Sequence, residues 1–425
     1  MAHYLHNPYP NHARVNTFEA CFEIANISSV HSQVTDSAYA EPGVNCLIRL
    51  PGGVTLFDGT TLNELSLDSR VGLAPMTRVS ATDDGHATAE MAQYYQRFAE
   101  GGFSFLITEG TYPDSAYSQG YLNQPGLATD AQAAAWQQVT EAVHDAGVPI
   151  FAQLMHAGAQ SQGNPHIDGE RTIAPSAVQP DGQKAEAYGG SGDFPTPKAA
   201  TVDELADIRD GFVTSAQNAI EAGFDGVEIH GANGYLLHEF LSGEFNQRDD
   251  EYGGEPANRV RYPREIVAAV DEATPADFVV GIRVSQSTIL DPEHRWPEGE
   301  DAAAVFFEEL STAGADYLHV TEPDATTPAF GDEGPTLAEA AAAHAADETV
   351  VIDNGGLGTP DAAREKVETG ADLVTLATSA LANPDWPDRV SEGEELTAFD
   401  PAEFLAPSAE LSEHELQTSS ASADD

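Results

Sequence analysis

Two segments of the chain combine residue types and spacing that suit chemistry. His230, Asn233 and Tyr235 stand within six residues of each other, in the sequence His-Gly-Ala-Asn-Gly-Tyr. An imidazole, an amide and a phenol can donate hydrogen bonds or carry a proton. A lone His or Tyr is more often structural, but three such groups in one short segment indicate a site.

The second segment is Gly355-Gly356, followed by Thr359-Pro360. Two glycines allow the backbone to approach a ligand closely. Thr is a good N-cap and Pro suits the first helical position, so a helix is expected to start here. Backbone N–H groups in such a turn can bind a phosphate, although a plain glycine turn is the alternative.

Both segments follow short apolar runs, and eight such runs occur between residues 71 and 376. They are rich in β-branched residues and apolar throughout, as expected for strands that are buried on both faces of a parallel sheet. The runs are Val71–Ala74, Phe103–Thr108, Pro149–Leu154, Gly226–His230, Phe278–Val284, Tyr317–Val320, Thr349–Ile352 and Leu373–Leu376.

Amphipathic segments alternate with these runs, and most of them are followed by Gly, a usual residue after a helix. The segments are 130–146, 201–222, 258–273, 301–313 and 360–369. Eight strand–helix pairs predict an α/β fold of the (βα)8 TIM-barrel type. An open doubly wound sheet is the alternative, but no G-x-G-x-x-G motif follows the first run.

Active sites of such barrels lie at the carboxyl ends of the strands. Polar, Gly or Pro residues stand at every one of these ends, which predicts one shared cavity. Those that we expect in the cavity, besides the two segments above, are Pro75, Met76, Thr77, Gly110, Gln153, Arg283, Ala377 and Thr378. Two further polar residues near strand ends have structural explanations. Glu109 can cap a helix or support the residues that line the cavity, and His156 can be a core histidine with satisfied hydrogen bonds.

Six ordered motifs between Val54 and Val390 resemble the old yellow enzyme family. Any one of them is weak, but their order and spacing make the resemblance specific. The motifs are Ser69-Arg70-Val71 with Ala74-Pro75-Met76-Thr77-Arg78, Gln153-Leu154-Met155-His156, His230 to Leu236, Asp250 to Gly254 with Asn258-Arg259, Asn354-Gly355-Gly356, and Ala382-Asn383-Pro384-Asp385.

The resemblance implies FMN as cofactor and NAD(P)H as reductant. Thr77 and Gln153 would hydrogen-bond the polar edge of the flavin ring. Arg283 would lie beside flavin N1 and O2, where a fixed cation stabilises the negative charge of the reduced ring. A rim ion pair is the alternative role for Arg283.

The resemblance also implies reduction of the C=C bond of an α,β-unsaturated carbonyl compound. His230 and Asn233 would bind the carbonyl oxygen, which gains charge when hydride adds to Cβ, and Tyr235 would protonate Cα. The alternatives are a barrel of the dienoyl-CoA reductase or amine dehydrogenase type, or a flavin-binding protein without turnover. The first normally needs a cysteine array, whereas Cys21 and Cys46 both precede the barrel.

One position departs from the family pattern. Many members have Gly-Arg after the eighth strand, where the arginine binds the FMN phosphate, and this chain has Ala377-Thr378. The threonine hydroxyl can donate a hydrogen bond but carries no charge. The sequence therefore predicts either weaker binding of the FMN phosphate or binding that is carried by the backbone.

The charge of the chain limits its partners. It has 70 acidic and 18 basic residues among 425, a formal net charge of −52. Such a surface repels nucleic acid and anionic membranes, so we expect neither as a partner, and the small-molecule substrate is the one that the resemblance implies. It suits a cytoplasm of very high salt, where charges are screened within about 3 Å, and we therefore hypothesise a halophilic source.

Composition also divides the chain. Residues 1–53 lack a clear periodicity and are predicted to be a disordered extension or a start called too early. The barrel is predicted over 54–405, and residues 406–425 are predicted to form an acidic disordered tail. We expect a cytoplasmic protein without a metal site, because neither a signal-peptide pattern nor a metal motif is evident, and homo-oligomerisation is possible.

Overall fold

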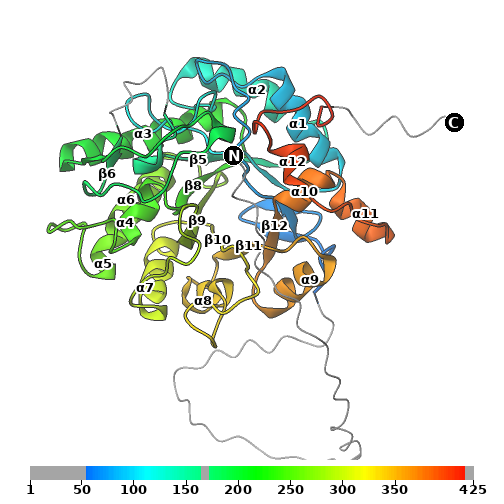
Figure 1. Ribbon diagram of the computed structural model, residues 1–425. Coiled ribbons are helices and arrows are strands. Elements are labelled where there is room, and N and C mark those ends of the chain that lie inside the picture. Colours follow the sequence, from blue (N-terminus) through cyan, green and yellow to red (C-terminus); the bar gives the residue numbers. More distant parts are fainter. Residues whose placement is uncertain (1–53, 164–171, 417–425) are drawn as a thin grey trace, which may run out of the picture. The chain divides into compact units, whose positions relative to one another are not determined.

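The computed structural model describes residues 54–163 and 172–416, and its centre is a closed barrel of eight parallel strands (Figure 1). Neighbours around the barrel are also neighbours along the chain, and the last strand pairs with the first. The strands are β3 (Val71–Leu73), β4 (Leu106–Ile107), β5 (Ile150–Leu154), β8 (Gly226–Asn233), β9 (Val279–Thr288), β10 (Tyr317–Thr321), β11 (Val350–Asn354) and β12 (Leu373–Leu376).

Each strand coincides with one of the eight predicted runs. The closed parallel barrel confirms the (βα)8 prediction and rules out the open doubly wound sheet. The runs form strands because their residues are buried on both sides, by the barrel interior and by the outer helices. β8 and β9 continue beyond the predicted ends, to Asn233 and Thr288, through polar residues at the barrel mouth.

Helices surround the barrel (Figure 1). Five of them match predicted segments, whereas α1 and α8 lie in segments for which no helix was proposed. The outer helices are α1 (Ala89–Glu100), α2 (Asp130–His144), α3 (Val202–Glu221), α6 (Arg261–Ala273), α7 (Glu300–Ser311), α8 (Leu337–His344) and α9 (Pro360–Thr369). Threonine N-caps begin five of these, and in α2, α3 and α8 a Gln or Glu completes a capping box.

A hairpin closes the amino end of the barrel. Its strands are β1 (Thr60–Leu62) and β2 (Leu65–Leu67), which pair antiparallel. Leu62 and Leu67 belong to one buried cluster with interior aromatic side chains of β5 and β10. The amino end is therefore filled with side chains, and the polar interior residues lie nearer the carboxyl end.

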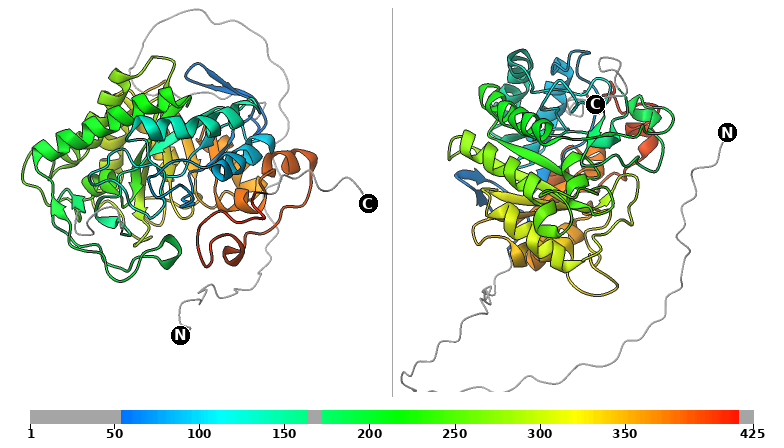
Figure 2. Two further views of the ribbon diagram at one scale, coloured as in Figure 1. Left: turned by 90° about the horizontal axis from the view of Figure 1, so that it is seen from above. Right: turned by 90° about the vertical axis from the view of Figure 1, so that its left-hand side faces the viewer.

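Irregular segments and several short helices lie at the carboxyl end. The segment after β5 contains the 3-10 turns η1 (Gly158–Gln160) and η2 (Glu186–Tyr188) and the strand pair β6 (Ile173–Ala174) and β7 (Lys198–Ala199). The remaining short helices are α4 (Leu236–Leu241), α5 (Pro256–Arg259), α10 (Thr378–Ala382), α11 (Trp386–Glu392) and α12 (Pro401–Phe404). Figure 2 shows the segment after β5 and the C-terminal segment at the same edge of the barrel, in agreement with the Ala409 N–H bond to Ala187 O (3.0 Å).

The prediction of a disordered tail from residue 406 is wrong for residues 406–416. Glu415 is fully buried and forms a 2.5 Å ion pair with Arg78, whose side chain is also fully buried. Arg97 donates a 2.7 Å bond to the backbone carbonyl of Glu415. A high acid content suggested a solvated tail, but one of those acids has a buried cation as its partner. Residues 417–425 and the predicted extension 1–53 lie outside the described residues.

Candidate active site

The predicted strand-end residues meet around a cavity of about 240 Å³ at the carboxyl end of the barrel. Of the thirteen predicted site residues, eleven line it, and Gly355 and Gly356 do not. The eleven are Pro75, Met76, Thr77, Gly110, Gln153, His230, Asn233, Tyr235, Arg283, Ala377 and Thr378. Six other residues that line the cavity were not among the predicted site residues: Arg78, Met155, Tyr188, Ile289, Leu381 and Leu405.

The first wall of the cavity follows β3 and β4. Pro75, Met76 and Thr77 are half-buried there, and the next residue, Arg78, is held from behind by the C-terminal segment. Gly110 packs its bare backbone against Met155, where a Cβ atom would collide with the methionine side chain. The wall is therefore shaped by close packing and has few protruding side chains.

Gln153 occupies the floor of the cavity at the end of β5. Its amide Nε2 donates a 2.8 Å hydrogen bond to Oε1 of Glu228, which lies on the neighbouring strand β8. Both side chains are buried. The NH2 group of the Gln153 amide is therefore bound to Glu228 below the cavity, and the other half of the amide faces the cavity.

Arg283 contributes a cation to the same floor from β9. It donates hydrogen bonds to Thr321 Oγ1 (3.1 Å) and Asn354 Oδ1 (2.7 Å), and Asn354 in turn donates to Thr375 O (2.9 Å). Burial lowers the pKa of Arg283, an effect that Glu228 opposes, and a guanidinium remains charged under these conditions. Its Nε has no hydrogen-bond partner in the described part of the chain, which suits a polar or anionic ligand group.

His230 is arranged as a hydrogen-bond donor. Its Nδ1 accepts the backbone N–H of Ala232 at 3.3 Å, which leaves the proton of the neutral ring on Nε2. Burial, together with the charge of Arg283, lowers the pKa of His230 to about 3. The ring is therefore neutral at ordinary pH and offers Nε2–H as a donor.

Asn233 owes its position to an unusual backbone conformation. Its φ is 63°, in the left-handed region that Asn tolerates better than most residues, and such positions cost on the order of 1–3 kcal/mol. The Ser285 hydroxyl accepts its N–H (2.8 Å), and its carbonyl accepts a bond from Gln160 (3.3 Å). These backbone bonds hold the residue at the cavity and leave its side-chain amide available.

Tyr235 lies beside His230, and the ring centroids are 5.0 Å apart. Its hydroxyl is in hydrogen-bond contact with that of Tyr121, which follows β4 and stacks edge-on against Tyr188 (5.2 Å). Burial raises the pKa of both Tyr235 and Tyr121. Sequence reasoning missed Tyr121 because it lies in a loop without periodicity or a motif.

The glycine pair after β11 has a backbone conformation that favours glycine. Gly355 and Gly356 have φ values of 134° and 68°, and a Cβ on Gly355 would overlap the backbone carbonyl of Glu322. Ala377 and Thr378 at the end of the adjacent strand β12 line the cavity, and Thr359 caps α9 as predicted. Phosphate binding by this region remains a prediction.

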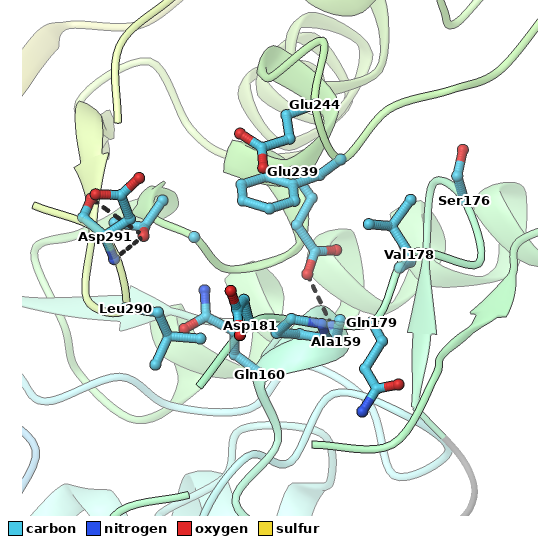
Figure 3. Close-up of a pocket in the computed structure, with 15 residues that line it drawn as sticks. Ala159, Gln160, Ser176, Val178, Gln179, Asp181, Glu239, Glu244, Leu290 and Asp291 are labelled. Carbon is cyan, nitrogen blue, oxygen red and sulfur yellow. Dashed lines mark hydrogen bonds between the residues drawn. The ribbon is translucent and has the colours of Figure 1, made fainter. Parts of the chain in front are cut away.

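A second cavity, of about 280 Å³, is lined by Gln160, Gly234 and Glu239 among other residues, and Figure 3 shows Gln160 and Glu239 there. Its most buried polar group is Glu239, whose Oε1 accepts the Ala159 N–H at 2.8 Å. Burial raises the pKa of Glu239 well above its ordinary value. This cavity is larger, but the imidazole, phenol and guanidinium groups face the first one, which is therefore the candidate active site.

The described residues fit an FMN ring. The cavity offers an amide floor, an arginine with an unpaired Nε and bare backbone at Gly110. A flavin ring requires polar contacts at one edge and close apolar packing over its faces, which Met76, Met155 and Leu381 can supply.

No helix in the described residues has the length and hydropathy needed to cross a membrane.

Comparison with known proteins agrees with this fit. The family model described as NADH:flavin oxidoreductase / NADH oxidase matches residues 55–397. The chain is 35% identical over 346 residues to a probable flavin mononucleotide-dependent alkene reductase of Leishmania infantum. The matched region covers 80% of this chain and 90% of the relative.

Two solved structures are similar in fold and sequence. The old yellow enzyme homologue from Zymomonas mobilis has a TM-score of 0.77 and 30% identity, over 86% of this chain and 99% of that one. Morphinone reductase in complex with tetrahydroNAD has a TM-score of 0.71 and 34% identity, over 82% and 93%. These matches confirm the predicted flavin oxidoreductase class, with FMN as cofactor and NAD(P)H as reductant, and favour it over the dienoyl-CoA reductase alternative. The chain belongs to the NADH:flavin oxidoreductase / NADH oxidase family, which includes the old yellow enzymes.

Proposed function

We propose that the enzyme reduces the C=C bond of small α,β-unsaturated carbonyl compounds at the cavity lined by His230, Asn233 and Tyr235. The observation that carries the proposal is the arrangement of two hydrogen-bond donors and one proton donor around one cavity. When bound, FMN would accept a hydride from NAD(P)H and would then donate a hydride to the substrate.

His230 and Asn233 bind the carbonyl oxygen of the substrate. When hydride reaches Cβ, the electron pair of the C=C bond moves towards that oxygen. The Nε2–H of His230 and the amide of Asn233 stabilise this charge, and removal of one such donor typically costs about 2.7–4 kcal/mol. Because His230 is neutral, it donates a hydrogen bond to the oxygen and keeps its proton.

Tyr235 delivers the proton to Cα, which completes the addition of one hydride and one proton across the double bond. A buried phenol with a raised pKa is a poor acid towards water but a sufficient one towards an enolate carbon. Tyr121 supports the transfer, since its hydroxyl contacts the Tyr235 hydroxyl and can stabilise the phenolate that forms.

The half-reactions provide the test. Tyr235→Phe is expected to slow reoxidation of the reduced flavin by cyclohexenone by at least tenfold and to leave reduction of the flavin by NAD(P)H nearly unchanged. Stopped-flow absorbance of the flavin follows both steps. An equal loss in the two half-reactions would contradict the proton-donor role, and no enone turnover in the unmodified enzyme would favour a flavin protein without this activity.

A further inference from the structure

A buried carboxylate beneath the cavity has no role in the proposed reaction. Glu228 on β8 is fully buried, and both of its oxygens accept hydrogen bonds. Oε1 accepts from Gln153 Nε2 (2.8 Å), and Oε2 accepts from the Tyr317 hydroxyl (3.2 Å) and from His319 Nδ1 (2.6 Å). The second nitrogen of His319 contacts Thr375 Oγ1 (2.8 Å), so the network joins four strands of the barrel.

Glu228 determines which way the amide of Gln153 faces. An ionised carboxylate can only accept hydrogen bonds, so the NH2 half of the amide must point at Glu228. The carbonyl oxygen of Gln153 is then the half left for the cavity, and it has no hydrogen bond to any residue of the described chain. A neutral partner below the amide would allow both orientations.

The surroundings keep Glu228 ionised. Burial alone would raise the pKa of this carboxyl, but His319, Arg283 and Gln153 together lower it. These groups reach Glu228 from β5, β9 and β10, and Tyr317 adds a hydroxyl from β10. Removing one partner from such a buried network leaves a charge or a donor unsatisfied, so the groups hold one another in place.

We propose that Glu228 is a positioning residue for the cofactor: it holds Gln153 with its carbonyl oxygen towards the cavity, where that oxygen accepts the N3–H of FMN. The inference rests on FMN as the cofactor. The polar edge of an oxidised flavin has a single N–H group, at N3, between two carbonyls. A fixed acceptor matches that group, whereas an amide turned the other way would place a donor opposite it.

The test compares the affinities of the apoprotein for FMN and for 3-methyl-FMN, which lacks the N3–H. Glu228→Gln is expected to weaken FMN binding about fivefold to tenfold, as for the loss of one oriented hydrogen bond. The preference for FMN over 3-methyl-FMN is expected to shrink by a similar factor, because Gln153 can then turn. Steric effects of the methyl group occur in both proteins. They cancel when the preference of the variant for FMN over 3-methyl-FMN is divided by the preference of the unmodified protein. Quenching of flavin fluorescence measures all four dissociation constants.

Two further variants separate orientation from folding. Tyr317→Phe removes one hydrogen bond to Glu228 Oε2 together with its donor, so no group is left unsatisfied. The carboxylate keeps its charge, its contact with His319 and its Oε1 bond to Gln153, so this variant should keep the unmodified preference for FMN. Glu228→Asp keeps the charge but shortens the side chain by one methylene, so it should lose the preference even if Glu228→Gln does not fold.

An unchanged preference in Glu228→Gln or, should that variant not fold, in Glu228→Asp would overturn the inference while leaving the cofactor intact. If the unmodified protein bound neither flavin, the cofactor assignment would fail and this inference with it.

Discussion

The ion pair between Arg78 and Glu415 gives the sharpest prediction for stability. Arg78 Nη1 and Nη2 donate to the two carboxylate oxygens at 2.5 and 2.8 Å, and Nε donates to Ala409 O at 3.0 Å. Glu415→Gln replaces one oxygen by an NH2 group, which faces the guanidinium as a second donor. The change therefore leaves a buried cation partly unpaired.

The magnitude follows from burial. Removing one partner of a buried ion pair typically costs about 3–5 kcal/mol. The guanidinium keeps its bond to Ala409 O, so we expect the lower end, about 3 kcal/mol, or roughly a hundredfold change in the unfolding equilibrium. Because salt screens buried charges weakly, the loss should persist in molar salt.

Equilibrium denaturation by urea at low and at molar salt measures this loss. Asp210→Asn is the matched control, since it breaks the exposed pair with Arg209, in which the Asp210 side chain is 72% exposed. The control should change stability by less than about 0.5 kcal/mol. If Glu415→Gln cost no more than the control, the C-terminal segment would not be held by this pair and our reasoning would be wrong.

Three other predictions concern pH, catalysis and salt. Burial raises the pKa of Glu109 to about 7, so the folded protein binds a proton that the unfolded chain releases near pH 4.5, and stability should fall by about 3 kcal/mol as pH rises between these values. Glu109→Gln should remove this slope and be the more stable protein at pH 8 in urea titrations, while near pH 4 the two should be equal; a parallel slope in both would show that Glu109 is not the cause. Asn233→Ala should lower kcat for cyclohexenone about a hundredfold with little change in flavin reduction by NAD(P)H, and an undiminished kcat would remove the amide from the oxyanion site. A net charge of −52 implies that thermal stability should rise between 0.1 and 2 M KCl, and a flat dependence would contradict the halophile hypothesis.

Local sequence predicted most of the fold because each barrel strand is a short run that must be buried on both sides. Gly after most of the predicted helices marked where they end, and Thr359 marked where one of them starts. The same logic located the cavity, since every strand end points to one mouth of the barrel. Thr77, Gln153 and Arg283 were therefore predicted to share a cavity although 76 and 130 residues separate them in sequence, and they do share it.

Three features could not be predicted, because each depends on contacts between distant residues. Tyr121 contacts Tyr235 across 114 positions, and nothing around Tyr121 indicates this role. Glu228 reads as one polar residue in an apolar strand until its partners on β5 and β10 are known. Glu415 looked like part of a solvated acidic tail because its partner, Arg78, lies 337 residues earlier.

The same separation has a consequence for the order in which the enzyme is made. Arg78 follows the first barrel strand and leaves the ribosome early, whereas Glu415 is added only after all eight strands have been synthesised. Domains generally fold as units, so Arg78 has no carboxylate partner from this segment until Glu415 has been synthesised. The arrival of Glu415 neutralises that cation and fixes the segment behind Thr77. The position of the cavity wall at Thr77 thereby depends on a residue that follows the whole barrel in sequence.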